Sequence, residues 1–424
     1  MKQFTLKNGI PVVLADMNGT NVMTALILFK VGSRNETQSI NGVSHFLEHL
    51  FFKGTENRPT TLDISRELDG LGADFNAFTS KDYTGYYVKV ASQHSEVAID
   101  ILEDLLFHPL FDPEEIERER GVIVEEINMY KDNPMATAEE LSEELLFGAH
   151  HPLGYRIAGP PENIMKISRK RILEYRDTYY HPDNMVIVLA GNLPKNIRSV
   201  ITKQFAVSPP ARRKTPPYKK FIYTQKAPRL LLEKKKTAQS HLALSFPGPT
   251  YTSKEGPAAQ VLSTILGGNM SSRLFINVRE RQGLCYYIRS GMTPYENMGA
   301  CTIQAGFDTK RIHQAVKAII EEIVDIREKK VTDEELEKAK QYITGKMSLR
   351  MEDSENIATW WASQALYYPT MESRESALKK VLAVTKSQVN NVAKKTFIQQ
   401  HANLVIVGPY SKSQEHTFKK HLSF

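Results

Sequence analysis

An internal repeat constrains this chain of 424 residues more than any other feature, because it divides the sequence into two halves with the same pattern. The segment that begins at Phe111, Phe-Asp-Pro-Glu-Glu-Ile-Glu-Arg-Glu-Arg, has a counterpart that begins at Val331, Val-Thr-Asp-Glu-Glu-Leu-Glu-Lys-Ala-Lys. A predicted helix over 168–180 followed by a buried strand over 185–188 likewise recurs at 385–397 and 404–407. Repetition of this kind is typical of a duplicated structural unit. We therefore expect two similar domains.

A proline-rich, basic stretch separates the two halves. Residues 207–218 read Val-Ser-Pro-Pro-Ala-Arg-Arg-Lys-Thr-Pro-Pro-Tyr, a composition typical of a semi-rigid linker. The sequence thus predicts a first domain over 1–206, a linker over 207–222 and a second domain over 223–424. Helices alternate with strands in each half, and some strands are joined as hairpins. This order indicates an α+β fold in which each domain packs a mixed, largely antiparallel sheet against helices.

Composition narrows the class of protein. Hydrophobic residues make up 41% and charged residues 24%, as in globular proteins. The net charge of +7 comes from interspersed residues, and no motif typical of nucleic-acid binding accompanies it. No apolar run approaches the ~18 residues of a membrane span, and no signal peptide precedes the first predicted strand. Two cysteines fit a reducing compartment. We expect a cytoplasmic protein that binds neither nucleic acid nor membrane.

The segment His45-Phe-Leu-Glu-His49 carries the strongest chemical signal. On a helix, positions three and four apart share one face, so both imidazoles and the Glu48 carboxylate would point to one spot. Two neutral imidazoles suit zinc, and a carboxylate beside a zinc-bound water is a general base. This order of residues is typical of the inverzincin peptidases. The alternative is a helix with surface histidines and an exposed glutamate.

A catalytic zinc usually has a third protein ligand. The acidic helix predicted from Asp112 to Tyr130 supplies the candidates. Glu126 and Glu125 are both possible, and they differ by about 100° of helix rotation. Glu119 lies about two helical turns before Glu126, on the same face. That position makes Glu119 a candidate partner for a ligand histidine. The residues alone leave the choice between Glu125 and Glu126 open.

These motifs resemble those of the pitrilysin family of zinc metallopeptidases, which includes insulin-degrading enzyme and mitochondrial processing peptidase. The whole chain is similar to half-length bacterial members related to the processing peptidase. The resemblance implies one zinc ion per chain, held by His45, His49 and Glu126. It also implies that Glu48 activates the attacking water and that Glu119 is a second functional glutamate.

Two further stretches match the family. It binds substrate as an added strand along a sheet edge, and the stretch Asn76-Ala77-Phe78-Thr79 resembles that edge, although from pattern alone 75–79 reads as a loop. The resemblance assigns Asn76, Ala77 and Phe78 to substrate binding. Such binding relies on main-chain hydrogen bonds. For side chains such as Phe78, an ordinary strand residue is an equally good interpretation.

In the second half, the resemblance assigns Arg279 and Tyr286 to the substrate carbonyl, and both can donate to an oxyanion. Without it, we would interpret Arg279 as a surface charge and Tyr286 as a core residue. The region matching the histidine helix, 258–268, contains no histidine, so only the first half is expected to bind metal.

The sequence therefore predicts a zinc metalloendopeptidase that hydrolyses peptides or unfolded polypeptide segments. A chain of half the family's full length implies a homodimer, with Arg279 and Tyr286 acting across the interface, while a heterodimer with an inactive homologue is also possible. The alternative functions are a catalytically silent homologous subunit and a metal-stabilised, peptide-binding scaffold.

Overall fold

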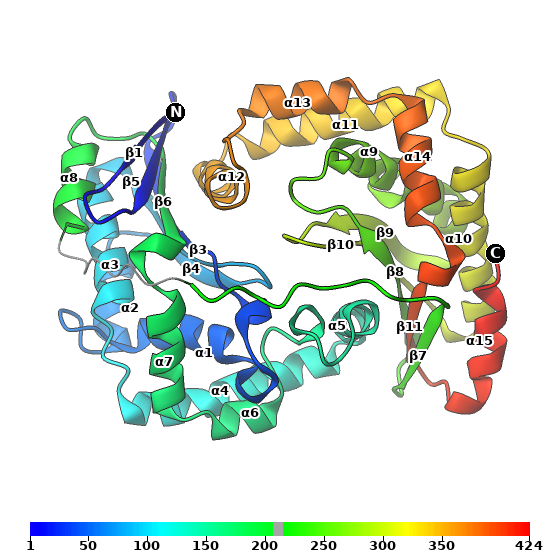
Figure 1. The fold of residues 1–424 in the computed structure, drawn as a ribbon, viewed down its shortest axis with the longest axis horizontal. Coiled ribbons are helices and arrows are strands. Elements are labelled where there is room, and N and C mark those ends of the chain that lie inside the picture. The colour runs from blue at the N-terminus through cyan, green and yellow to red at the C-terminus, as the bar shows by residue number, and fades with distance from the viewer. Residues whose placement is uncertain (207–214) are drawn as a thin grey trace. The chain divides into compact units, whose positions relative to one another are not determined.

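The computed structural model describes residues 1–206 and 215–424, so the first half of the predicted linker, 207–214, lies outside the described residues (Figure 1). The chain forms two compact units. Unit 1 comprises Met1–Ile127, Tyr155–Lys219 and Ser348–Met371, apart from the residues not described. Unit 2 comprises Asn128–Gly154, Lys220–Met347 and Glu372–Phe424. Each unit is described here by itself.

Unit 1 contains a six-stranded sheet with the order β1-β2-β6-β3-β5-β4. Its neighbouring strands are antiparallel except for the parallel pair β2 and β6. The strands are β1 (Lys2–Thr5), β2 (Pro11–Asp16), β3 (Val22–Phe29), β4 (Asp74–Thr79), β5 (Thr84–Ala91) and β6 (Met185–Gly191). The helices are α1 (Val43–Leu50), α2 (Thr61–Gly70), α3 (Ser95–Phe107), α4 (Pro113–Asp132), which runs on into unit 2, α6 (Pro161–Lys166), α7 (Arg169–Tyr179), α8 (Ile197–Gln204) and α12 (Ser354–Tyr367).

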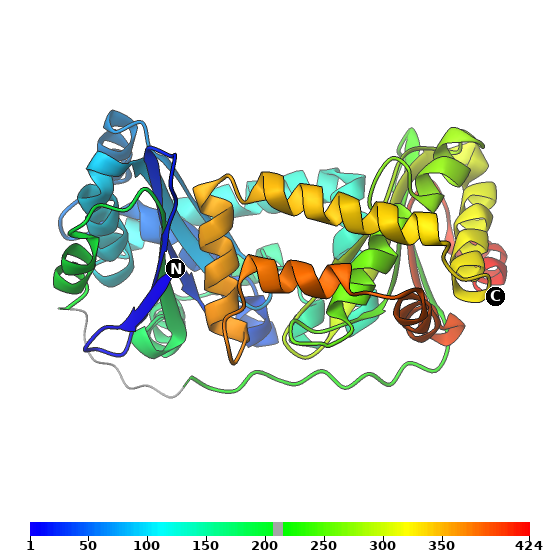
Figure 2. The ribbon, with the colours of Figure 1, turned by 90° about the horizontal axis from the view of Figure 1, so that it is seen from above.

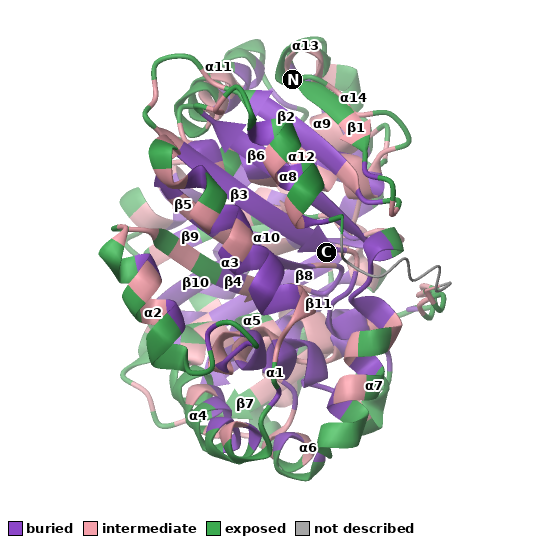
Figure 3. Ribbon diagram, turned by 90° about the vertical axis from the view of Figure 1, so that its left-hand side faces the viewer, coloured by how far each residue is buried: buried purple, intermediate pink, exposed green. Residues whose placement is uncertain are grey.

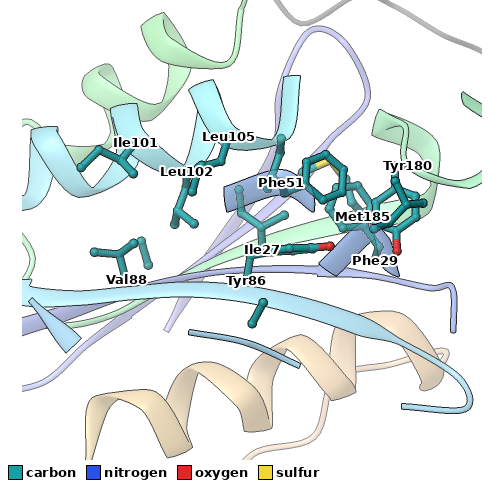
Figure 4. Packing of buried hydrophobic residues seen from close by; sticks show 14 of the residues in the cluster. Ile27, Phe29, Phe51, Tyr86, Val88, Ile101, Leu102, Leu105, Tyr180 and Met185 are labelled. Carbon is teal, nitrogen blue, oxygen red and sulfur yellow. The ribbon is translucent and has the colours of Figure 1, made fainter. Parts of the chain in front are cut away.

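The central strands β3 and β6 are buried along nearly their whole length, and Figure 3 shows them in purple. Their sequences are apolar apart from Thr24 of β3, as expected of strands covered on both faces. On one face, Ile101, Leu102 and Leu105 of α3 point toward Ile27 and Val88 of the sheet (Figure 4). Helices α1 and α7 share this core. The main core of unit 1 therefore lies between the sheet and the helix that carries the histidine motif.

Unit 2 contains a five-stranded sheet with the order β7-β11-β8-β10-β9, in which only β7 and β11 are parallel. The strands are β7 (Arg229–Lys234), β8 (Gln239–Gly248), β9 (Cys285–Thr293), β10 (Gly299–Asp308) and β11 (Asn403–Gly408). The helices are α5 (Pro134–Phe147), α9 (Gly256–Gly267), the π-helical segment η7 (Phe275–Glu280), α10 (Ile312–Glu328), α11 (Asp333–Arg350), which begins here and ends in unit 1, α13 (Arg374–Leu382), α14 (Lys386–Thr396) and α15 (Glu415–His421).

The two sheets follow one plan. Strands β2, β6, β3, β5 and β4 of unit 1 correspond in order and direction to β7, β11, β8, β10 and β9 of unit 2, and β1 is an addition. Each sheet has one parallel pair among antiparallel neighbours. The predicted fold class, two duplicated α+β domains with mixed, largely antiparallel sheets, is confirmed.

The units differ from the predicted domains in one respect, since neither is a continuous segment. Helix α12 follows most of unit 2 in sequence but covers the second face of the unit 1 sheet, as the light-orange helix beside the blue strands shows (Figures 1 and 2). Its Ala358 and Ala362 pack against Leu26, Leu28 and Val188. Helix α5 covers the unit 2 sheet in the same way, through Ala138 and Leu141. The predicted boundaries therefore describe the sequence repeat, whereas each sheet takes one covering helix from the other half.

Among the described residues, no helix combines the length and the apolar character that a membrane span needs.

Candidate metal centre

Helix α1 forms because its apolar residues repeat at helical spacing and meet the core. Val43, Phe46, Leu47 and Leu50 are fully buried. Gly42 precedes the helix with φ 100°, in the left-handed region, and a Cβ there would lie 2.6 Å from the carbonyl oxygen of Ala158. Only glycine fits this backbone and this space. The start of α1 is therefore fixed.

A buried carboxylate caps α1 in place of an N-cap side chain. Glu36 Oε1 accepts from the backbone N–H of Ser44, and Oε2 accepts from the backbone N–H of Gly42 and from Asn41 Nδ2, each at 2.8 Å. The carboxyl group lies at the positive end of the helix dipole, which favours its ionised form. Because His45 directly follows Ser44, this cap also fixes the first histidine of the motif. The sequence analysis did not identify Glu36.

We expect the Glu36→Gln substitution to change the pH dependence of stability. Burial raises the pKa of the Glu36 carboxyl from 4.5 to about 7, despite the opposing hydrogen bonds from Asn41, Ser44 and Gly42. A raised folded-state pKa means that the stability this group contributes is full below pH 4.5 and is lost as the pH rises through about 7. Between pH 5 and 8, the thermal midpoint of the metal-free protein should therefore fall more steeply in wild type than in Glu36→Gln. Parallel profiles in the two proteins would contradict the assignment.

His45, His49 and Glu126 converge on one face of α1. Glu126 Oε2 lies 3.6 Å from His45 Nε2 and 3.3 Å from His49 Nε2, and one ligand atom from each of the three residues lies within 4.8 Å of the others. Two ligands of a tetrahedral zinc, each about 2.0–2.2 Å from the ion, lie about 3.3–3.6 Å apart. The donor types and their spacing therefore fit a zinc ion. Glu125, the rival on α4, is exposed and outside this cluster.

Glu119 holds the second histidine in place. His49 Nδ1 lies 2.8 Å from Glu119 Oε1, and Lys53 Nζ lies 2.6 Å from Glu119 Oε2. A carboxylate at Nδ1 keeps the proton on that nitrogen and leaves Nε2 as the ligand atom. Although burial opposes it, hydrogen bonding to His49 and Lys53 keeps the pKa of Glu119 below its usual value. Glu119 therefore faces a ligand rather than the ion.

The electrostatics of the cluster match a cation site. Hydrogen bonds from His45 and His49 hold the pKa of Glu126 far below its usual value. Burial lowers the pKa of His49, but the hydrogen bonds to Glu119 and Glu126 outweigh it and raise this pKa to about 9. Two carboxylates thus concentrate negative charge around the second imidazole, which favours a bound positive charge, either a proton or a metal ion.

Glu48 lies between the two histidines in sequence and contacts strand β4. The hydroxyl of Thr79, the last residue of β4, donates to Glu48 Oε2 at 2.5 Å. From the sequence, Thr79 belongs to the stretch that resembles the substrate-binding edge, but no contact between Thr79 and Glu48 was predicted. Thr79 reaches α1 from a separate strand, whereas Glu36 lies just before the helix and reaches back to it across the intervening turn. The local signal for such a cap is a helix that begins after glycine without a side-chain cap of its own.

The segment that pattern alone predicted as a loop is the edge strand β4, which pairs with β5 and has no other neighbour in the described sheet. Ala77 is buried in the core beside α1, whereas Phe78 packs with the cluster under α12. Gly85 of β5 leaves room for the Phe78 ring, since a Cβ there would lie 2.3 Å from it. Asn76 is exposed. Phe78 is thus directed into packing, and β4 offers mainly its main-chain edge.

Arg279 and Tyr286 lie side by side in unit 2. The Arg279 guanidinium carbon is 5.8 Å from the centre of the Tyr286 ring and 4.6 Å from that of Phe275. Tyr286, the second residue of β9, is 76% exposed, so the interpretation of Tyr286 as a core residue was wrong. Arg279 belongs to the π-helical segment η7, a rare structure that often occurs at functional sites. The Arg279 guanidinium and the Tyr286 side chain, the two predicted hydrogen-bond donors, thus lie next to each other.

Both halves of the chain match models of known protein families. Residues 11–161 match the model described as insulinase (peptidase family M16), and residues 166–343 match the one described as peptidase M16 inactive domain. The first match contains every residue of the metal cluster together with Glu48 and Glu119. The second contains Arg279 and Tyr286.

Similar proteins span nearly the whole chain. An uncharacterized zinc protease of Bacillus subtilis is 34% identical, over 96% of this chain and 98% of that protein. Another from Streptomyces coelicolor is 32% identical, over 98% of this chain and 91% of that protein.

Two solved structures share the fold. A protease from Helicobacter pylori aligns with a TM-score of 0.90 at 23% identity, over 96% of this chain and 99% of that one. A peptidase M16 inactive domain from Pseudomonas fluorescens aligns with a TM-score of 0.89 at 20% identity, over 97% of this chain and 98% of that one. Because both identities are below 25%, these two similarities establish the fold and nothing further.

Proposed function

Because this chain belongs to the insulinase family of zinc proteases, peptidase family M16, we propose that it is a zinc-dependent metalloendopeptidase acting on peptides or unfolded polypeptide segments. The observation that carries the proposal is the convergence of His45, His49 and Glu126 beside Glu48. Zinc held by these three ligands, one ion per chain, would polarise the scissile carbonyl and acidify a water molecule.

The side chains of this site have distinct roles in the proposed reaction. Glu48 accepts the proton of the attacking water at its carboxylate and passes it to the leaving amine, so no covalent intermediate is needed. Glu119 holds the proton on His49 Nδ1, which orients the imidazole. The open edge of β4, at Asn76, Ala77 and Phe78, binds the substrate main chain as an added strand. Binding of this kind favours substrate segments in extended conformation and depends little on the identity of the substrate side chains.

Arg279 and Tyr286 complete the proposal. Their guanidinium and phenol groups can both donate to the substrate carbonyl oxygen as it gains negative charge. The exposure of Tyr286 and its proximity to Arg279 support this role. The intact donor set of unit 1 favours a peptidase over a silent homologous subunit or a peptide-binding scaffold, since such proteins have no need of a general base beside the metal ligands.

The test of the proposed function is the digestion of one polypeptide in two states. The purified protein, with its zinc content measured, is incubated with the folded and the unfolded form of the same substrate, and fragments are identified by mass spectrometry. We expect internal cleavage of the unfolded form and little cleavage of the folded form. Zinc-containing protein that leaves both forms intact would refute the proposal.

We propose further that the active protein is a homodimer in which Arg279 and Tyr286 act on the substrate bound by the partner subunit. Chains carrying Arg279→Ala and chains carrying Glu48→Gln should each be inactive, and mixing them should restore up to about a quarter of the activity through one intact composite site. Sedimentation measures the subunit number of the wild type. No recovery in subunit-exchanging mixtures would contradict action across an interface, and a monomeric active protein would contradict the dimer.

A further inference from the structure

Thr79 links the general base to the edge strand. Its hydroxyl donates to Glu48 Oε2 at 2.5 Å, and both side chains are half-buried. No second hydrogen bond to the Glu48 carboxylate occurs among the residues that the structure describes. This contact therefore determines the orientation of the carboxylate more than any other polar contact of the described chain.

The pairing of β4 with β5 fixes the backbone position of Thr79. Thr79 pairs with Thr84 of β5, which is fully buried and donates its hydroxyl to the carbonyl of Val31 at 2.9 Å. Side chains alternate along a strand, so Thr79 lies on the same face as Ala77, toward α1, while Phe78 packs on the opposite face. The hydroxyl is thus directed at Glu48 by the register of β4.

We propose that Thr79 is a positioning residue for Glu48, an inference that rests on the proposed peptidase function. The terminal torsion of a glutamate is broad, so a carboxylate without a partner samples many orientations. A hydrogen bond from a neutral donor to a carboxylate is short and strong. The bond to Oε2 restricts this torsion and leaves Oε1 free to accept the proton of the attacking water.

The same contact makes the position of Glu48 depend on β4. This strand has an open edge, and it is the strand that we propose to hold the peptide. A peptide paired along β4 restricts the motion of that strand and, through the Thr79 hydroxyl, restricts the motion of the base. Substrate binding and the orientation of the base are therefore coupled through one side chain.

The experiment compares Thr79→Val, which keeps the branched shape but lacks the hydroxyl, with Thr79→Ser, which keeps the hydroxyl. Steady-state cleavage of a fluorogenic peptide is measured at equal zinc content. For Thr79→Val we expect kcat to fall about 10- to 100-fold, the range for a hydrogen bond to a charged group, with KM within about twofold of wild type. Thr79→Ser should keep most of kcat. Full kcat in Thr79→Val, an equal loss in both variants, or a rise in KM alone would overturn the proposal.

Two controls separate this inference from the proposed function. In a Glu48→Gln background, Thr79→Val should cause no further loss, because the group that it positions is already disabled. Wild type that is no more active than Glu48→Gln would refute the function itself. In that case, crystal structures of both Thr79 variants still decide the contact. We expect Glu48 in one orientation in Thr79→Ser and in several in Thr79→Val, and a single orientation in both would overturn the positioning role.

Discussion

Replacing Glu48 by glutamine is expected to abolish peptide hydrolysis while leaving zinc bound. The substitution keeps the size of the side chain and still accepts a hydrogen bond from Thr79, but an amide cannot take a proton from water. General acid–base catalysis contributes about 10²- to 10⁴-fold, so kcat should fall by at least about 100-fold. Cleavage of a fluorogenic peptide and zinc content are measured on the same preparations.

The expected result for Glu48→Gln separates the proposed peptidase from its alternatives. A peptide-binding scaffold would bind peptide equally well before and after the substitution, and neither protein would cleave it. A variant that retains both zinc and full activity would show that Glu48 is not the general base. Loss of zinc together with activity would mean that Glu48 helps to hold the ion.

Replacing Glu126 by glutamine should remove most zinc binding, whereas Glu125→Gln should not. Both substitutions remove one negative charge from adjacent positions of α4, so their difference isolates the ligand contact. Glu126 Oε2 lies 3.3 Å from His49 Nε2, while Glu125 is exposed. Loss of a direct ligand should weaken zinc binding by more than the ~10- to 100-fold typical of losing a partner behind a ligand.

Competition with a fluorescent chelator measures zinc affinity in both α4 variants and in wild type. Equal affinities in the two variants would contradict the assignment of Glu126 as a ligand. A larger loss in Glu125→Gln would require a register of α4 different from the one in the structure.

Local periodicity explains why part of this site could be predicted from sequence. His45, Glu48 and His49 share a helical face whatever the rest of the chain does, because three- and four-residue spacings fix that geometry. Which glutamate of α4 faces them depends on how α4 packs, which its charge-rich sequence does not show. The resemblance to a known family pointed to Glu126, and the structure brings that residue to both histidines.

The features that the sequence did not reveal depend on contacts between distant segments. Strand β4 contains asparagine and alanine, which have low strand propensity, so a loop was the better prediction from pattern alone. The apolar residues of α12 show that it packs on something but do not say on which sheet. The hydroxyl of Thr79 reaches Glu48 from the edge strand, and Glu36, although close in sequence, reaches the start of α1 only because the chain turns back between them. Such contacts leave no periodic pattern to detect.

The measurement that tests the central claim most directly is a zinc titration of metal-free protein with peptide cleavage as the readout. If His45, His49 and Glu126 form one catalytic zinc centre in each chain, activity should rise from near zero and reach a plateau at one zinc ion per chain. Activity that is full without zinc, or that stays absent when one ion per chain is bound, would contradict the account.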